Sequence, residues 1–339
     1  MNPLVSILIP AYNAEPWIAD TIDSAIAQTW PRKEIIVVDD GSTDQTLHVA
    51  RGFASKSILI ATQPNGGASA ARNHAFSLSQ GDYIQWLDAD DVLAPSKVSL
   101  QMKSIEHAPS PRTLLSGAWG AFFFRTEKAK FSPSQLWCDL TPTEWLIRKM
   151  THGAHMQTAN WLVSRELTEA AGPWDTRLLG DDDGEYFCRV LLQAAGIVFV
   201  AGAKSYYRSV GESQLSEIGR SDAKLEAQFL SNELHVKYLR SLEDSERSRG
   251  AAVRYLQKYM FDFYPERPDI VQKARELAQG LGGRLELPQS SWKYAWIHKT
   301  LGWKASKRAQ LTLPKIKTRI YRTWDGLCFR SRNRRLSRN

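Results

Sequence analysis

The chain has 339 residues, of which 43% are apolar, and a net charge of +8 at pH 7. Such a chain can bury a large core, and its length predicts two domains or one large domain with an appendage. Its three cysteines, Cys138, Cys188 and Cys328, are far apart and lack metal-ligand spacing, which excludes a disulfide framework and a zinc site and fits a reducing cytosol. The sequence enters a strand almost at once, and its longest apolar run, 190–203, is short and interrupted. We therefore expect neither a targeting nor a transmembrane segment.

Apolar strands alternate with amphipathic helices through the first hundred residues. The spacing predicts strands over 4–9, 34–38, 57–61 and 83–87. Helices are predicted over 14–28, 68–78 and 95–107, with a further helix that is capped by Ser42, Thr43 or Asp44 and ends at Ala50. This alternation predicts an α/β fold with a mostly parallel, doubly wound sheet.

Acidic residues follow two of these strands directly. Asp39 comes after the second strand, and Asp88 and Asp90 come after the fourth. Ligands of open α/β sheets bind beyond the carboxyl ends of parallel strands, so acids at these positions indicate a binding site. Asp88 and Asp90 are close enough to share a divalent cation such as Mg²⁺ or Mn²⁺, or a hydroxyl-rich ligand. An Asp-x-Asp pair alone is also typical of a capped turn.

Four ordered segments resemble the motifs of family 2 glycosyltransferases. They are Pro10–Asn13, Glu34–Asp44, Gly66–Asn73 and Asp88–Asp91. The resemblance implies a GT-A fold that binds a nucleotide-diphospho-sugar. It also implies roles for single residues. The nucleotide base would be contacted by Pro10, Ala11, Tyr12 and Asp39 and flanked by Arg72. Asp88 would contact the ribose, and Asp90 would bind a Mn²⁺ or Mg²⁺ cofactor that bridges the diphosphate.

A second acidic cluster, Asp181–Asp183, begins a predicted helix. Acids at a helix N-terminus interact favourably with the helix dipole, but one would suffice for that purpose. By the same resemblance, Asp183 is the catalytic base that takes the proton of an acceptor hydroxyl. Asp182 stands where the family usually has Glu, and Asp181 leaves the register ambiguous, so Asp182 is the alternative base. A base without an enzyme nucleophile predicts inversion at the anomeric carbon.

The rest of the chain divides into an acceptor half and a helical end. We expect residues 1–110 to form the nucleotide-sugar-binding half of the GT-A domain and 111–218 the acceptor half, in which strands over 113–124 leave the parallel sheet. A helix capped by Thr141 should begin at Pro142. Val210 stands where the family often has a His beside the diphosphate, so Arg208 or Ser213 is expected to substitute. Helical spacing over 222–245, 248–261 and 268–279 predicts a helical extension over 219–288.

The last segment, 289–339, is strongly basic. It contains 14 Lys and Arg residues but a single acidic residue, Asp325. Aromatic residues are interleaved with the cations: Trp292, Tyr294, Trp296, Trp303, Tyr321, Trp324 and Phe329. An anionic membrane surface, nucleic acid, or a solvated or packing segment would each fit this composition. A lipid-linked acceptor favours the membrane, and we expect no nucleic-acid partner.

Together these patterns predict a bacterial-type, inverting, metal-dependent glycosyltransferase at the inner face of the cytoplasmic membrane. We expect it to use a UDP-sugar and to build a surface polysaccharide or lipopolysaccharide. A nucleotidyltransferase is the alternative enzyme, but it would need a basic triphosphate-binding loop, and residues 10–20 contain no Lys or Arg. A membrane or nucleic-acid adaptor with a degenerate sugar site is the non-enzyme alternative, which the intact set of four acids (Asp39, Asp88, Asp90 and Asp183) disfavours.

Overall fold

The structure is a computed structural model that describes residues 2–106, 110–210 and 221–336. Its strands are β1 (Val5–Ala11), β2 (Lys33–Asp39), β3 (Ile58–Thr62), β4 (Tyr83–Trp86), β5 (Val92–Leu93), β6 (Thr113–Phe122), β7 (Lys130–Phe131), β8 (Val163–Ser164) and β9 (Gly196–Arg208). Its α-helices are α1 (Ile18–Ile26), α2 (Thr46–Arg51), α3 (Ala68–Leu78), α4 (Lys97–Ile105), α5 (Pro142–His152), α6 (Arg165–Ala171), α7 (Asp182–Gln193), α8 (Asp222–Leu242), α9 (Glu246–Phe263), α10 (Pro268–Gly280) and α11 (Ala295–Leu336).

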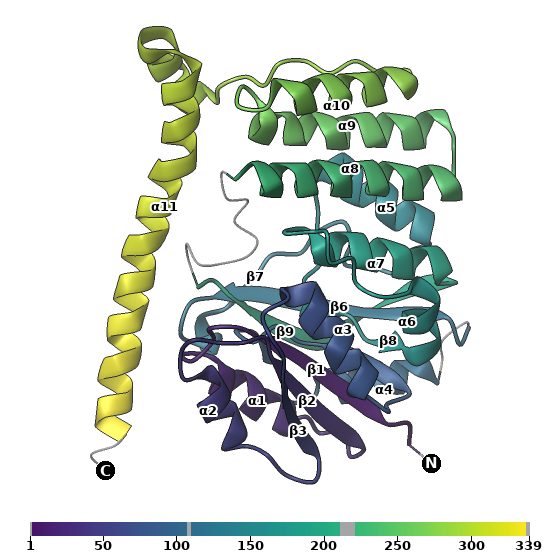
Figure 1. The fold of residues 1–339 in the computed structure, drawn as a ribbon, viewed down its shortest axis with the longest axis vertical. Helices are drawn as coiled ribbons and strands as arrows, with labels where there is room; N and C mark the ends of the chain where they lie inside the picture. The colour runs from purple at the N-terminus through teal and green to yellow at the C-terminus, as the bar shows by residue number, and fades with distance from the viewer. Residues whose placement is uncertain (1, 107–109, 211–220, 337–339) are drawn as a thin grey trace.

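The first sheet has the strand order β3-β2-β1-β4-β8 (Figure 1). Strands β1 to β4 pair in parallel, as the alternation of strands and helices predicted, whereas β8 adds an antiparallel edge. The register sets Ala11 of β1 beside Asp39 of β2. The carboxyl ends of β1 and β2, which carry two of the four motifs, therefore lie next to each other.

The second sheet has the order β5-β9-β6-β7 and mixed strand directions. The prediction that residues 113–124 leave the parallel sheet is confirmed, because β6 lies in this second sheet. Strand β9 has a bulge opposite Gly117. A Cβ atom at Gly117 would overlap the carbonyl of Ala203, so glycine permits the close approach of the two strands.

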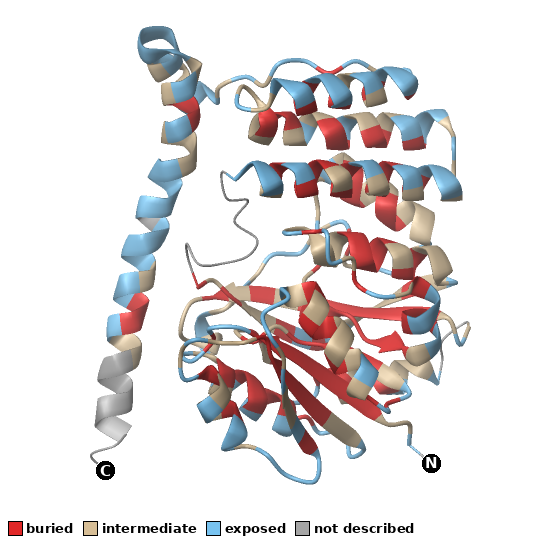
Figure 2. Cartoon of the chain, in the orientation of Figure 1, coloured by how far each residue is buried: buried red, intermediate tan, exposed pale blue. Residues whose placement is uncertain are grey.

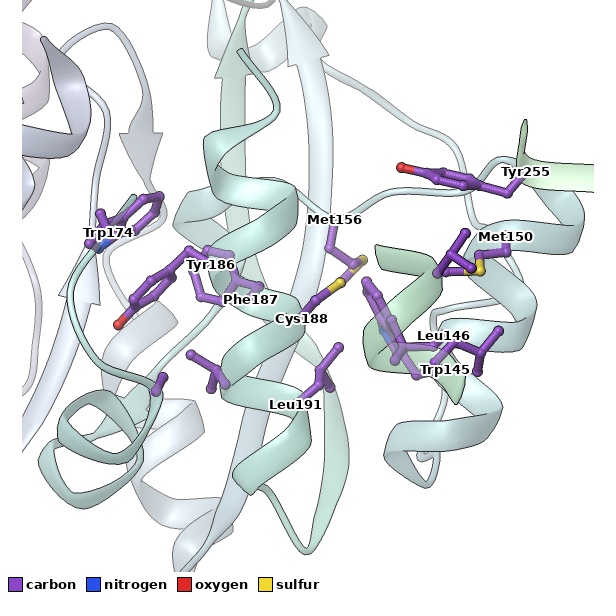
Figure 3. Close-up of a cluster of buried hydrophobic side chains, with 14 of the residues drawn as sticks. Trp145, Leu146, Met150, Met156, Trp174, Tyr186, Phe187, Cys188, Leu191 and Tyr255 are labelled. Carbon is purple, nitrogen blue, oxygen red and sulfur yellow. The ribbon is translucent and has the colours of Figure 1, made fainter. Parts of the chain in front are cut away.

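Helix α7 forms the centre of the hydrophobic core on the acceptor side. In Figure 3 its residues Tyr186, Phe187 and Cys188 lie between Trp174 on one side and Trp145 of α5 on the other. The ring of Tyr186 stacks on Trp174, with 4.0 Å between centroids and 7° between planes. The acidic cluster therefore lies at the start of a helix that is packed into the core.

The helical extension packs in layers on α5 and α7. Figure 1 shows α8, α9 and α10 stacked above the two sheets, and Figure 2 shows that their buried residues face one another and the domain below. The prediction of a helical extension is confirmed. A box of reciprocal hydrogen bonds between Ser245 and Ser248 starts α9, so the chain turns sharply between α8 and α9.

The basic segment forms α11, whose backbone is kinked at Gly302 (φ 80°, ψ 177°); the long part after the kink runs alongside the stack and the sheets (Figure 1). Near its start, Lys307 donates hydrogen bonds to the carbonyl of Tyr264 and to Glu266, both at 2.6 Å. Near its end, Asp325 accepts a hydrogen bond from Arg125 Nε at 2.6 Å and one from the Phe124 amide at 3.1 Å. Within the described ranges, none of the helices is long and apolar enough to cross a membrane.

Candidate active site

The first group of site residues lies where β1 and β2 end. The side chain of Asp39 is buried; its Oδ2 accepts a hydrogen bond from the Ser42 amide at 3.2 Å. Its other oxygen, Oδ1, is buried with no hydrogen-bond partner in the described chain. Tyr12, one residue past β1, is half exposed. An unpaired buried acceptor is costly unless a ligand donates to it, so Asp39 is suited to an N–H group of a ligand.

Asp40 holds the loop that precedes α3, a function the sequence did not reveal. Its carboxylate accepts hydrogen bonds from the amides of Gly66 and Gly67 at 2.9 and 2.8 Å and from Gln63 at 2.8 Å. The second and third motifs are thus joined by one buried carboxylate. In the sequence, only the position of Asp40 next to Asp39 indicated a functional residue. That position could not show whether Asp40 contacts a ligand or, as found, the loop before α3.

The acidic loop after β4 brings three carboxylates together, and they differ in their contacts. Asp91 is buried and accepts the Arg208 amide at 2.8 Å, which ties the loop to β9. Asp90 is partly buried and forms no ion pair with a described residue. Burial and the neighbouring Asp88 raise the pKa of Asp90 to about 7. Two adjacent carboxylates that repel each other fit a divalent cation, which would neutralise them.

Arg208 supports this loop from below. Its Nε donates to the Asp90 carbonyl at 2.7 Å, and its Nη2 pairs with Asp20 at 2.9 Å. Its guanidinium also lies between the rings of Trp17 and Phe122. Val210 is buried, and Ser213, the other residue considered for a diphosphate contact, lies outside the described residues.

Arg72 connects the donor side of the site to the acceptor side. It is buried in α3, and its guanidinium pairs with Asp88 at 2.7 Å and with Asp182 at 2.6 Å. The ring of Trp174 lies 4.3 Å from the same guanidinium. Asn73, the next residue, exchanges hydrogen bonds with the backbone of Trp174. The structure therefore brings Arg72, Asp88 and Asp182 together, whereas Asp39 lies at the exit of a different strand.

The three acids at the start of α7 point to three different partners. Asp181 contacts Ser231 of the helical extension at 2.6 Å, and Asp182 contacts Arg72. Among the described residues, Asp183 has only a long contact of 3.4 Å from Thr158. Burial, followed by the charges of Asp182 and Asp181, raises the pKa of Asp183 to about 7. Of the three acids, Asp183 has the weakest attachment and a pKa suited to accepting a proton near neutral pH.

Among the described residues, this site offers a cation fewer than three protein ligands. Across the described residues, no cluster of three or more His, Cys, Asp or Glu side chains is arranged around a potential metal position. A Mg²⁺ or Mn²⁺ ion commonly completes its coordination with substrate phosphates and water. The pair of Asp88 and Asp90 therefore fits a cation that binds together with a diphosphate.

Comparisons with known proteins agree with this geometry. Residues 6–166 match the family model described as Glycosyl transferase family 2. An uncharacterized glycosyltransferase of Rickettsia typhi is 32% identical over 197 residues, which cover 56% of this chain and 59% of the relative. The uncharacterized glycosyltransferase EpsJ of Bacillus subtilis is 33% identical over 190 residues, which cover 54% of this chain and 53% of the relative. The chain thus spans less than two thirds of the length of either relative.

A solved structure, that of S. aureus TarS 1-349 in complex with UDP-GlcNAc, has a similar fold. The TM-score is 0.57 at 18% identity, and the match covers 82% of this chain and 90% of TarS 1-349. At this identity the similarity is one of fold. The chain has a GT-A fold with a helical C-terminal region, and residues 6–166 match the model of glycosyl transferase family 2.

Proposed function

We propose that the protein is an inverting glycosyltransferase that moves a sugar from a nucleotide-diphospho-sugar, a UDP-sugar, to a hydroxyl of a glycan or lipid-linked acceptor. The observation that carries this proposal is the position of Arg72 between Asp88 and Asp182. The buried guanidinium of Arg72 thereby links the acidic loop of the donor side to the turn that carries Asp183. The complex of TarS with UDP-GlcNAc supports the choice of a UDP-sugar.

The donor nucleotide would bind across the ends of β1, β2 and β4. Asp39 Oδ1, which is buried and unpaired among the described residues, would accept the ring N–H of uracil. The exposed ring of Tyr12, after Pro10 and Ala11, would contact the face of the base. Asp88 would bind the ribose. Arg72 would act by holding Asp88 in place, since its guanidinium is engaged by two carboxylates.

Asp90, together with Asp88, would hold a divalent cation. When bound, a Mg²⁺ or Mn²⁺ ion supplies Lewis-acid stabilisation of the charge on the leaving diphosphate. The raised pKa of Asp90 supports this fit: burial and the neighbouring charge of Asp88 raise it, and the charge of Arg208 offsets them only in part. Arg208 would keep the loop in position through the Asp90 carbonyl.

In the transfer step, Asp183 would act as the general base. It takes the proton of the acceptor hydroxyl while the oxygen forms a bond to the anomeric carbon. The bond from that carbon to the diphosphate oxygen breaks, and the nucleoside diphosphate leaves with the electron pair. Attack from the face opposite the leaving group inverts the centre, so an α-linked donor gives a β-linked product. A product with retained configuration, observed by NMR, would exclude this mechanism.

The first experiment is a thermal-shift screen of the purified protein with UDP, GDP, dTDP and CDP, each with and without Mn²⁺. A ligand that binds only the native state raises the melting temperature. We expect stabilisation by UDP that requires Mn²⁺, is lost in Asp90→Asn and is reduced in Asp39→Asn. No shift with any nucleotide would favour the adaptor.

We further propose that α11 attaches the protein to an anionic membrane surface. Five apolar side chains along it are largely exposed and are spaced three or four residues apart: Leu313, Ile316, Ile320, Trp324 and Leu327. This spacing sets them on one face of the helix, here called the apolar stripe. Asp325, on another face, is buried against Arg125. An exposed apolar stripe in a segment with 14 cations and one acid has the properties of an interfacial helix.

A membrane location would suit a lipid-linked acceptor and a role in surface polysaccharide or lipopolysaccharide synthesis. The test is co-sedimentation with vesicles of phosphatidylcholine, with and without phosphatidylglycerol. The triple variant I316S/I320S/W324S should bind anionic vesicles at least about tenfold more weakly, because each buried apolar side chain contributes about 1.5–3 kcal/mol. A matched triple variant at exposed apolar residues elsewhere, I26S/L59S/L287S, should bind normally. Equal binding of both triple variants would contradict the proposal.

A further inference from the structure

We infer that Ser231 and His235 of the helical extension are positioning residues for the base, acting through Asp181. This inference rests on the proposed function, in which Asp183 is the base. Asp181 is two residues before Asp183 and is the last residue before α7. Its carboxylate points away from the donor side, towards α8.

The turn at Asp181 has a backbone conformation that needs support. Asp181 has a left-handed backbone conformation with φ 55°, which residues other than glycine seldom adopt. Its side chain accepts no capping hydrogen bond from α7. A Cβ atom at Gly184 would overlap Asp181 Oδ1, so the carboxylate occupies the space that a larger residue at 184 would fill. The carboxylate therefore lies under the first turn of α7, next to the residue that follows the base.

Side chains from α8 and α9 hold this carboxylate. Ser231 Oγ donates to Asp181 Oδ2 at 2.6 Å. His235 Nδ1 lies 3.2 Å from Ser231 Oγ and 3.7 Å from Asp181 Oδ2. Tyr255 of α9 contacts the same nitrogen at 2.9 Å. Ser231 and His235 are completely buried, so this contact is an internal connection between the extension and the site.

The arrangement divides the work among three consecutive acids. Asp182 is fixed to the donor side by Arg72, and Asp181 is fixed to the extension by Ser231. Asp183 lies directly after these two attachments, and within the described part of the chain its one contact of this kind is the long one with Thr158. A base must be placed within hydrogen-bond reach of the proton it takes, and errors of about 1 Å can cost about a hundredfold in rate. The two anchors determine where Asp183 can reach.

A kinetic comparison of full-length variants tests this inference. The assay measures UDP release from a panel of UDP-sugars, UDP-GlcNAc among them, in the presence of Mn²⁺, and UDP binding is followed by thermal shift. Ser231→Ala should lower kcat by about tenfold or more, with the KM for the donor and the shift caused by UDP unchanged. Ser231→Thr retains the hydroxyl and should restore kcat. Ser241→Ala, an exposed serine on the same helix, is the control and should match the wild type.

His235→Asn provides a second variant, should Ser231→Ala fail to fold. It removes the ring that supports Ser231 but keeps a donor, and it should lower kcat without affecting UDP binding. Wild-type kcat in both Ser231→Ala and His235→Asn, with Asp183→Asn inactive, would overturn the inference and leave the proposed function intact. Full activity of Asp183→Asn, or no UDP release by the wild type, would overturn the proposed function and the inference with it.

Discussion

Replacing Arg72 with methionine should lower the free energy of unfolding by about 3 kcal/mol. Methionine keeps apolar volume beside Trp174 but removes the guanidinium that lies 2.7 Å from Asp88 and 2.6 Å from Asp182. Each charge-assisted hydrogen bond contributes about 1.5–3 kcal/mol. The side chains of Asp88 and Asp182 keep 29% and 17% of their exposure, so water compensates part of the loss, and we use the lower value for each bond.

The measurement is equilibrium unfolding in urea at pH 7, followed by tryptophan fluorescence. Arg177→Met is the matched control, because Arg177 pairs with Asp175 at 2.6 Å but its side chain is 68% exposed. Exposed pairs contribute less than about 1 kcal/mol, so this variant should unfold near the wild-type urea concentration. A double-mutant cycle of Arg72→Met with Asp182→Asn should give a coupling energy of about 1–3 kcal/mol. Equal stability of the two methionine variants, together with zero coupling, would refute the bridging role of Arg72.

Three further predictions concern the base and the long helix. Because the pKa of Asp183 is raised to about 7, the rate of UDP release should increase about tenfold per pH unit up to about pH 7 and then level off. Asp182→Asn removes a negative neighbour of Asp183 and should move the midpoint of this pH–rate curve to lower pH. The pKa of Asp183 is higher in the folded than in the unfolded state, so its contribution to the free energy of unfolding is full below about pH 4 and is lost as the pH approaches 7. The free energy of unfolding in urea should therefore vary less with pH in Asp183→Asn than in the wild type over this range. The same pH dependence in both proteins would contradict the shift. Lys307→Met removes the hydrogen bonds to the Tyr264 carbonyl and Glu266 and should speed tryptic cleavage within α11, whereas Lys304→Met, an exposed lysine on the same helix, should not.

The position of the donor-side acids was predictable because they follow strands directly. Period and composition locate β2 and β4, and a parallel sheet brings their carboxyl ends to one edge, so the sequence alone placed Asp39 and Asp88 at that edge. Their part in a binding site stays a prediction. The pairing of Arg72 with Asp182 was not predictable, since 110 residues separate the partners and no local pattern links them. For the same reason the sequence could not distinguish the three acids at 181–183, whose partners lie on distant elements.

The second sheet and the last helix were incompletely predicted for reasons of length and composition. Strands β5, β7 and β8 have two residues each, too few to show a strand period. The single sheet expected from the first hundred residues is therefore accompanied by a second one, formed mainly by β6 and β9. In α11 the cations and interleaved aromatic residues gave a clear composition but did not reveal the few buried contacts that hold the helix, such as that of Asp325. The sequence alone therefore left a membrane surface, nucleic acid, and a solvated or packing segment all open.

The pair between Asp325 and Arg125 also decides how α11 is oriented about its own axis. A long helix held at one end can roll, and rolling would turn its apolar stripe and its basic flank in every direction. The hydrogen bonds of Asp325 to Arg125 and to the Phe124 amide stop this rotation, because they hold one side of the helix against the domain. Asp325, the single acidic residue in a basic segment, thus fixes the rotation of the long part of α11 about its own axis. A charge reversal at this one position would therefore change the direction in which the stripe faces relative to the site, without altering the stripe itself.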